Sequence, residues 1–144
     1  MKRAEHSAVV DGTAEEVFAF LADVGNLPRW QAGVTRAEQT SPGPMAVGST
    51  ARVDRRLLGQ EVGADLRVTR LEPGRALVLA TDAAGLHVDA SITLEPLDDA
   101  RCRVTFGMAM EASSVFMKPM EAMVAQAAES DIAASLEALQ RAFA

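Results

Sequence analysis

The sequence predicts an α+β fold in which a curved antiparallel sheet of seven strands wraps around one long C-terminal helix. Three observations predict it. Residues 9–30 read as the end of a strand followed by a short helix, residues 33–111 read as strands separated by turns, and residues 117–143 fit one amphipathic helix. Such an arrangement tends to enclose a cavity between sheet and helix.

The N-terminal region predicts one strand and one or two short helices. Residues 3–10 have strand character. Thr13 is a helix-capping residue, and Glu16 stands three positions later, which matches a capping box. The helix should end near Gly25, because residues 26–28 (Asn-Leu-Pro) favour a turn.

Six further strands are predicted in the middle of the chain. Apolar and polar residues alternate in the later strands, which predicts one buried face and one solvated face. The connections contain the residues that favour turns, such as Gly59-Gln60, which predicts a tight hairpin. The predicted strands are 33–40, 49–58, 61–71, 75–81, 86–97 and 101–111, with turns at 41–44, 72–74, 82–85 and 98–99.

The last helix is predicted from Met117 to Phe143. Pro119 is tolerated only in a first helical turn, so the helix should begin close to Met117. A helix of this length spans about 40 Å, enough to lie across a whole seven-stranded sheet. Its apolar stripe is formed by Met120, Val124, Ala127, Ala128, Ile132, Leu136, Leu139 and Phe143.

Length and composition favour a single cytoplasmic domain over residues 1–144. The 144 residues suit one domain. The net charge of −6 argues against nucleic-acid binding, which needs clustered basic residues. The single cysteine, Cys102, excludes an intramolecular disulfide, and we read it as a buried, inert thiol. No residues have metal-ligand or nucleotide-binding spacing, so we expect no metal and no cofactor, and no run is long enough to insert in a membrane.

With these elements in place, the chain resembles the START-like helix-grip superfamily (SRPBCC proteins), and within it the polyketide cyclase/dehydrase and lipid-transport group. The resemblance covers essentially the whole chain and is specific for the fold rather than for one activity. It rests on the segment AEEVFAFLADVGNLPRW, on the terminal helix, and on Val17, Phe18, Leu21, Asp23, Leu27, Pro28, Trp30 and Gly48.

The resemblance implies binding or carriage of an apolar small molecule, such as a lipid, polyketide or quinone, between sheet and helix. The alternative is a polyketide cyclase or dehydratase that acts on a carbonyl compound in the same cavity. A homodimer is left open. The candidate ligand-binding residues are Trp30, Val53, Arg55, Leu66, Val88, Ala90, Ile92, Phe106, Met108, Met110, Phe116, Met120, Met123 and Val124.

Arg55 and Trp30 are the candidates for orienting the ligand. Arg55 falls in phase with Ala51 and Val53, so a regular strand would point its guanidinium into apolar surroundings, where it needs an anion. Alternatively, the strand twists there and Arg55 reaches water. Trp30 could form a wall at the cavity mouth or simply plug the core.

Methionines cluster between the last strand and the last helix. Met108, Met110, Met117, Met120 and Met123 could form an adaptable apolar lining, because the flexible thioether side chain fits varied guests; the alternative is ordinary core filling. Phe116 is assigned to the same wall.

Catalytic candidates are few. His87 and Asp89 share one strand face and could form an acid–base pair, but that face reads as solvated. The chain has no tyrosine, and its other histidine, His6, has no evident partner. Charges on residues 52–67 are expected to pair across a hairpin on the outer face. A protein-interaction module, as in the related chaperone-activator branch, would need a large exposed apolar patch that this outer face does not supply.

Overall fold

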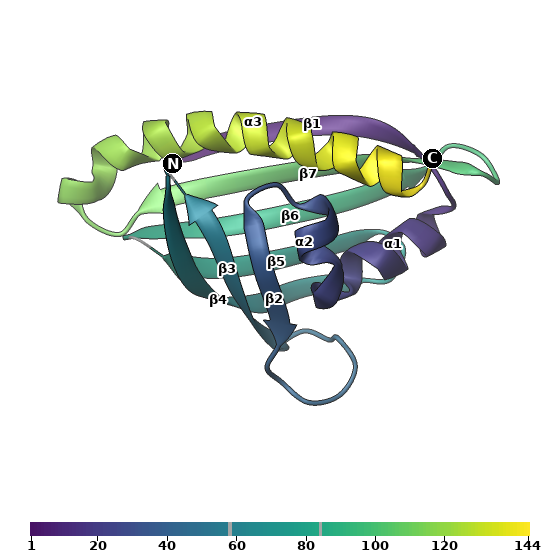
Figure 1. Cartoon of the computed structure of the whole chain (residues 1–144), viewed down its shortest axis with the longest axis horizontal. Helices are drawn as coiled ribbons and strands as arrows, with labels where there is room; N and C mark the ends of the chain where they lie inside the picture. The colour runs from purple at the N-terminus through teal and green to yellow at the C-terminus, as the bar shows by residue number, and fades with distance from the viewer. Residues whose placement is uncertain (58, 84) are drawn as a thin grey trace.

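In the computed structural model, which describes residues 1–57, 59–83 and 85–144, the predicted elements occur in the predicted order. The described residues form one antiparallel sheet of seven strands in the order β1-β7-β6-β5-β4-β3-β2 (Figure 1). The strands are β1 (Lys2–Asp11), β2 (Val34–Gln39), β3 (Thr50–Leu57), β4 (Gln60–Glu72), β5 (Ala76–Ala83), β6 (Leu86–Pro96) and β7 (Arg101–Ala112). The helices are α1 (Ala14–Ala22), η1 (Val24–Asn26), α2 (Leu27–Trp30), η2 (Val115–Met117) and α3 (Lys118–Ala142).

The predicted cap of the first helix is present. Thr13 Oγ1 accepts a hydrogen bond from the Glu16 backbone N–H at 3.1 Å. The Glu16 carboxylate accepts from the Thr13 hydroxyl, also at 3.1 Å, rather than reaching the cap backbone as a full capping box would. The side-chain cap nevertheless satisfies one of the free N–H groups at the start of α1.

The first helix ends earlier than predicted, and the predicted turn is itself helical. Asp23 has extended backbone geometry, which ends α1 at Ala22, and its carboxylate caps the short helix η1 by accepting from Gly25 N–H. Pro28 stands in the first turn of α2, where its missing N–H leaves no helical bond unmade. A proline at the start of a segment is compatible with a turn or a helix, so the sequence did not separate the two.

Strand ends differ from the prediction by one or two residues. Gln60 pairs with Leu57 instead of standing in the turn, because the β3–β4 ladder extends to the hairpin. β5 continues into the predicted 82–85 turn, where Asp82 pairs with His87. Leu58, predicted as the end of a strand, and Ala84, predicted within that turn, lie outside the described residues.

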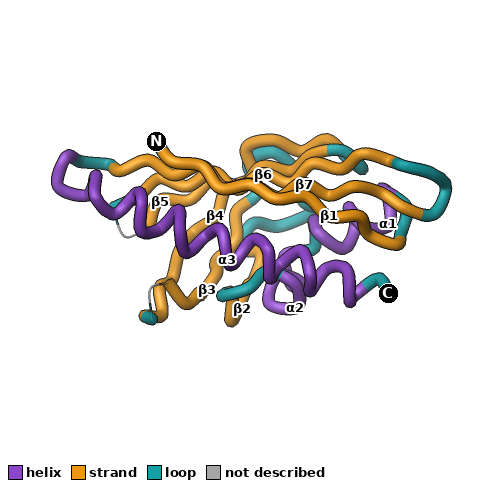
Figure 2. Tube along the Cα trace, turned by 90° about the horizontal axis from the view of Figure 1, so that it is seen from above, coloured by secondary structure: helices purple, strands orange, loops and turns teal. Residues whose placement is uncertain are grey.

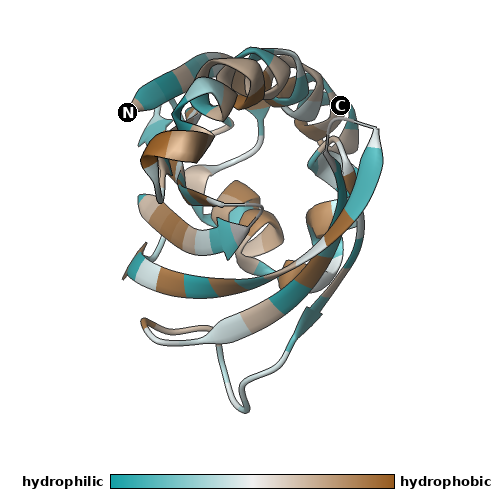
Figure 3. Cartoon of the chain, turned by 90° about the vertical axis from the view of Figure 1, so that its left-hand side faces the viewer, coloured by the Kyte–Doolittle hydropathy of each residue, from teal (hydrophilic) through white to brown (hydrophobic). Residues whose placement is uncertain are grey.

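The sheet is strongly curved, and it forms a trough beneath α3 (Figure 3). Two irregularities contribute, since a bulge bends a strand and increases its twist. The register shifts between Val34 and Arg36 on β2, and between Val68 and Arg70 on β4. Apolar side chains line the inside of this trough.

The long helix packs along one side of the sheet, although its length would let it lie across all seven strands. It runs along β1 and β7 for most of the length of the molecule (Figure 2). Its buried stripe is narrower than predicted, because Met120, Ala127 and Phe143 are only half-buried at its flanks. The fully buried part consists of Val124, Ala128, Ile132, Leu136 and Leu139, joined by Glu121 and Ser135.

The tightest packing lies under the C-terminal half of α3, where α1 and α2 close the trough. Trp30 packs edge-on against Phe106, with ring centroids 5.4 Å apart, and Phe20 packs similarly against Phe143 at 5.5 Å. Ile132 is completely buried at the same depth. The N-terminal half of α3 has no such cover from α1 and α2, and the cavity described below lies beneath it.

Candidate ligand-binding cavity

A cavity of about 60 Å³ lies between the inner face of the sheet and the N-terminal half of α3. Several of its walls are half-buried rather than buried, among them Arg55, Val62 and Val88, so the cavity reaches solvent. It is lined by Val53, Arg55, Val62, Ala64, Leu66, Thr81, Leu86, Val88, Met108, Met110, Val124, Ala128 and Asp131.

A second space of about 20 Å³ adjoins the first and extends it toward α2. The two share six wall residues, Arg55 among them. The extension also touches Leu27, Gln31 and Ala90. Arg55 therefore stands where the two spaces meet.

The cavity is small for a ligand. Sites for drug-sized molecules enclose about 300–1,000 Å³, and the first space, at about 60 Å³, has room for only a few water molecules. Met108 and Met110 form part of its floor. Their flexible side chains are the walls that can move most easily to admit a larger guest.

Arg55 is the outstanding polar group in this apolar wall. It comes from the inner face of β3, opposite Val62 on β4, as its phase predicts. Its Nε atom is buried and has no hydrogen-bond partner among the described residues. Burial lowers the pKa of Arg55, an effect that the charge of Asp131 partly offsets. The group stays charged, because the guanidinium does not deprotonate in proteins.

Asp131 faces Arg55 from the opposite wall. It lies on the flank of α3, one position before the buried Ile132. Burial raises the pKa of Asp131, and the positive charge of Arg55 opposes that rise. A carboxyl group with a raised pKa next to a cation can hold or release a proton closer to neutral pH than an ordinary aspartate.

Gly33 lies beside this pair. An alanine Cβ at this position would lie 3.7 Å from Asp131 Oδ2 and 3.9 Å from Arg55 Nη2, so both charged groups lie against the same backbone. Gly33 has a φ of +89°, which a residue with a side chain adopts only with strain. The loop before β2 thus brings bare backbone beside the charges.

Ser135 fixes the same loop to α3. Its hydroxyl accepts a hydrogen bond from the Ala32 backbone N–H at 2.8 Å and donates to the Asp131 carbonyl at 2.6 Å. Ser135 is completely buried. One side chain thereby connects the loop that carries Gly33 to the helical turn that carries Asp131.

Eight of the residues predicted to bind ligand line the two spaces. They are Val53, Arg55, Leu66, Val88, Ala90, Met108, Met110 and Val124. Trp30, Ile92 and Phe106 are buried in the core instead. Trp30 holds its indole N–H without a hydrogen-bond partner among the described residues, and it packs as a core plug rather than as a wall at the mouth.

Three predicted wall residues lie outside the cavity. Phe116 is 93% exposed and Met123 53% exposed, while Met120 is half-buried on the flank of α3. The prediction extended the wall from Met110 to the helix without a break. The chain instead turns outward through η2 before α3 begins, which carries Phe116 away from the sheet.

The residues missing from the predicted set are of two kinds: further apolar residues of the same strand faces and of α2, such as Leu27, Val62 and Leu86, and polar or small residues. Asp131, Thr81 and Gln31 bring oxygen atoms to the two spaces, and Ala128 lines the first one. A signal for Asp131 existed, because it stands seven positions after Val124 and so shares a helix face with that stripe residue.

His87 and Asp89 lie on the outer face of the sheet, away from Arg55. The His87 ring bonds Asp82 through Nδ1 at 2.8 Å and Asp89 through Nε2 at 3.2 Å. This arrangement raises the pKa of His87, mainly through the hydrogen bond to Asp82. His6 has an unforeseen partner, Glu129 on α3.

Other predicted features of the outer face and the core are in place. Arg52 pairs with Asp65 across the β3–β4 hairpin at 3.3 Å, as expected. Cys102 is buried, and burial raises the pKa of its thiol. An open hollow of about 580 Å³ on the outer face lies over Gly107 and Ser91 and contains none of the polar groups of the inner cavity.

The described residues contain neither a membrane-spanning helix nor a metal-binding group. None of their helices combines the length and the apolarity needed to cross a membrane. In the same part of the chain, no group of three His, Cys, Asp or Glu side chains is placed to hold a metal ion.

Comparison with known proteins gives a family and a fold. Residues 1–144 match the family described as polyketide cyclase/dehydrase and lipid transport. Among curated proteins, none matches the sequence. A START superfamily protein from Mycobacterium smegmatis has a similar structure, with a TM-score of 0.79, 15% identity and coverage of 99% of both chains.

Two aromatase/cyclase structures are also similar. The Zhui aromatase/cyclase from Streptomyces sp. R1128 gives a TM-score of 0.76 at 18% identity, over 97% of this chain and 94% of that one. The di-domain aromatase/cyclase BexL of the BE-7585A biosynthetic pathway gives 0.77 at 22% identity, over 98% of this chain. The match covers 46% of BexL, so this chain spans about half of its length. At identities this low, the structural similarity establishes a shared fold and nothing more.

Proposed function

Because the chain belongs to the polyketide cyclase/dehydrase and lipid transport family, we propose that it binds and carries an apolar small molecule that bears a carbonyl or carboxylate group. The ligand would lie between the sheet and α3, with its polar end at Arg55. Lipids, polyketides and quinones have this chemistry. The observation that carries the proposal is the buried Nε of Arg55, which has no hydrogen-bond partner among the described residues and lies in a mostly apolar wall.

A buried donor without an acceptor costs free energy, roughly 1–3 kcal/mol. A ligand oxygen that accepts from Arg55 would remove that cost on binding. Because the guanidinium donor carries a positive charge, this hydrogen bond is also stronger than one between neutral groups. The apolar remainder of the ligand would be stabilised by burial against Val53, Leu66 and Val88, at about 25 cal/mol per Å² before the entropic costs of association.

Binding of such a ligand requires the cavity to widen. The walls that would move are the flank of α3 and the methionines of the floor, since α3 packs on β1 and β7 and leaves β3 and β4 free to separate from it. We therefore propose that the structure is the contracted form of the site. A bound ligand would move Met108 and Met110 to new rotamers.

A second candidate function is a cyclase or dehydratase reaction on a carbonyl compound. Asp131 is the observation that favours it, because a carboxyl group with a raised pKa is suited to general acid–base catalysis. Arg55 would stabilise negative charge that develops on the carbonyl oxygen, and Asp131 would transfer the proton. The aromatase/cyclase names among similar structures support this alternative without distinguishing it from carriage.

The test of binding is native mass spectrometry of protein isolated from its natural host. We expect a non-covalent adduct with the mass of a lipid-like or polyketide-like compound. Arg55→Ala should lower the affinity for that compound roughly 10- to 100-fold, the loss of one hydrogen bond to a charged group. Arg56→Ala is the matched control, because Arg56 is the exposed neighbour on the same strand.

Full affinity in the Arg55→Ala protein would remove Arg55 from the site. Persistent absence of any adduct, also after incubation with host lipid extract, would count against carriage itself. Incubation of the identified compound with wild type and with Asp131→Asn separates the two functions. If both proteins bind the compound equally but only the wild type converts it, the protein is an enzyme. If the compound is unchanged after incubation with either protein, the protein is a carrier.

A further inference from the structure

An apolar tip projects from the end of the molecule where β7 leads into α3. Phe116 is 93% exposed and Val115 86% exposed, both in η2, and Met123 on α3 is 53% exposed. These values are exceptional for large apolar side chains, which are usually at least partly covered. We call these three residues the apolar tip. Its exposure is unfavourable in water and points to a partner that covers it.

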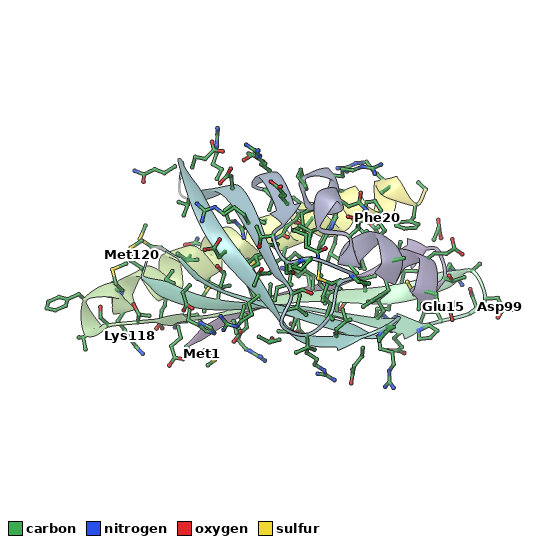
Figure 4. The ribbon with its side chains drawn as sticks, turned by 90° about the horizontal axis from the view of Figure 1, so that it is seen from below. Met1, Glu15, Phe20, Asp99, Lys118 and Met120 are labelled. Atoms are coloured by element: carbon green, nitrogen blue, oxygen red, sulfur yellow. The ribbon has the colours of Figure 1, made fainter. Side chains whose placement is uncertain are left out.

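Two lysines lie at the same end, although the protein as a whole carries a net charge of −6. Lys2 and Lys118 are the only lysines of the chain. Figure 4 shows Met1 and Lys118 at this end, together with Met120. Lys118 is exposed, and so is Lys2, which pairs with Met110 near the end of β7.

The acidic residue nearest to Lys118 is already engaged. Glu121 is almost completely buried, and its carboxylate accepts from the Ala112 N–H at 2.7 Å and lies 3.3 Å from the Met1 amino group. Lys118 Nζ lies 3.7 Å from the same carboxylate. Glu111, which is exposed, is the acid next along β7. The tip therefore has two lysines beside apolar side chains, with two exposed carboxylates nearby: that of Glu111, and that of Asp82 in the β5–β6 hairpin on which Met117 packs.

The apolar tip lies next to a wall of the cavity. Met117, the last residue of η2, packs so closely on Gly85 that a Cβ there would lie 2.9 Å from its side chain. Ser113 holds the same turn, donating from both its N–H and its hydroxyl to the Gly85 carbonyl at 3.0 and 2.8 Å. The next residue, Leu86, lines the cavity.

A second copy of the chain is a poor partner for this tip. A stable protein interface buries about 800 Å² on each partner. Even an aromatic side chain buries only about 150–250 Å², so three side chains fall short of that area. A convex tip with a few large apolar residues and flanking lysines instead fits a lipid surface, where apolar side chains insert and lysines extend to the phosphates.

We propose that η2 and the first turns of α3 dock on an anionic phospholipid bilayer, with Phe116 and Val115 inserted and with Lys2 and Lys118 at the lipid phosphates. Docking would bring the cavity wall at Leu86 close to the membrane, the place where an apolar ligand dissolves. The proposal goes beyond the proposed function, and vesicle binding needs no cavity ligand, so either can fail without the other.

The test is flotation of the full chain with vesicles of phosphatidylcholine, with or without phosphatidylglycerol. We expect binding to the mixed vesicles, and Phe116→Ala should weaken it about tenfold or more. Val47→Ser is the matched control, because Val47 is 64% exposed in the β2–β3 loop, away from the tip. It should leave binding unchanged.

The charge contribution is tested separately. Lys118→Gln should weaken binding to the mixed vesicles about fivefold and leave the weaker binding to phosphatidylcholine alone unchanged. Arg75→Gln, at an exposed position of the β4–β5 turn, is its control. Three results would overturn the proposal: no vesicle binding by the wild type, equal binding by Phe116→Ala, or a dimer in sedimentation equilibrium that Phe116→Ala abolishes.

Discussion

Arg55 and Asp131 are the two residues on which the proposed function depends. Burial removes part of the hydration of each side chain. It therefore lowers the pKa of Arg55 and raises the pKa of Asp131. They attract each other across the wall beside Gly33 without joining in a direct ion pair. Their unused hydrogen-bonding capacity is therefore free for a ligand, whereas a closed ion pair would have consumed it.

The environment of His87 predicts that the stability of the folded state depends on pH. Its pKa is raised above the ordinary 6.5, first by the hydrogen bond to Asp82 and also by the charge of Asp89. Glu111 on β7 is its register neighbour on the other side. Protonated His87 thus stabilises the folded state; this contribution is complete below pH 6.5 and is lost as the pH rises through the higher folded-state pKa.

We expect His87→Gln to remove that part of the pH dependence. The wild type should lose thermal stability relative to His87→Gln between pH 6 and pH 9. Because the ring is more than a third exposed, the effect should stay within about 1 kcal/mol. Thermal melts at several pH values measure it, and parallel curves for the two proteins would contradict the assignment.

At the scale of elements, Ser135 connects the loop before β2 to α3. Ser135→Ala leaves the Ala32 N–H without its acceptor, and an unsatisfied buried donor costs about 1–3 kcal/mol. We expect urea unfolding to report a loss of that size. Ser130→Ala is the control, because Ser130 is exposed on the same helix and should change stability by less than about 0.5 kcal/mol.

Helix boundaries show what local signals could and could not predict. The Thr13 cap and Pro119 located the starts of α1 and α3 to within a residue, because both act through local hydrogen bonds and backbone geometry. The helical form of residues 27–30 depends on tertiary contacts. Leu27 and Trp30 are buried against the core, and that burial stabilises a helix of a single turn that would not form alone.

At the scale of the molecule, the cavity exists because α1 and α2 close only one end of the trough. Ala128→Leu should fill the space of about 60 Å³ beneath α3. We expect the variant to change the free energy of unfolding by less than about 1 kcal/mol, since added carbons enter empty space rather than a filled core. Binding of any cavity ligand should be lost.

Ala133→Leu is the companion variant, because Ala133 is exposed on the same helix and the chemical change is identical. It should retain ligand binding. A loss of several kcal/mol in Ala128→Leu, measured by denaturant unfolding, would mean that the space is not available to a side chain. Calorimetric titration with the compound found by mass spectrometry provides the second measurement.

The sequence by itself determined the order of the elements and the inward face of each later strand, and it gave the inward direction of Arg55 as one of two alternatives. Alternation and helical periodicity are local consequences of backbone geometry, so they can be read from neighbouring residues. Eight of the predicted ligand-binding residues line the two spaces for this reason.

Only the tertiary structure decided which of the residues predicted to face inward line the cavity, which pack in the core, and which are exposed to solvent. Ile92 and Phe106 share a face with Val88 and Met108, yet both are buried in the core, and Phe106 packs against Trp30 of α2. The path of α3 along β1 and β7 placed Asp131 opposite Arg55, and the outward turn of η2 exposed Phe116. These outcomes depend on contacts between segments far apart in the chain, which no local pattern encodes.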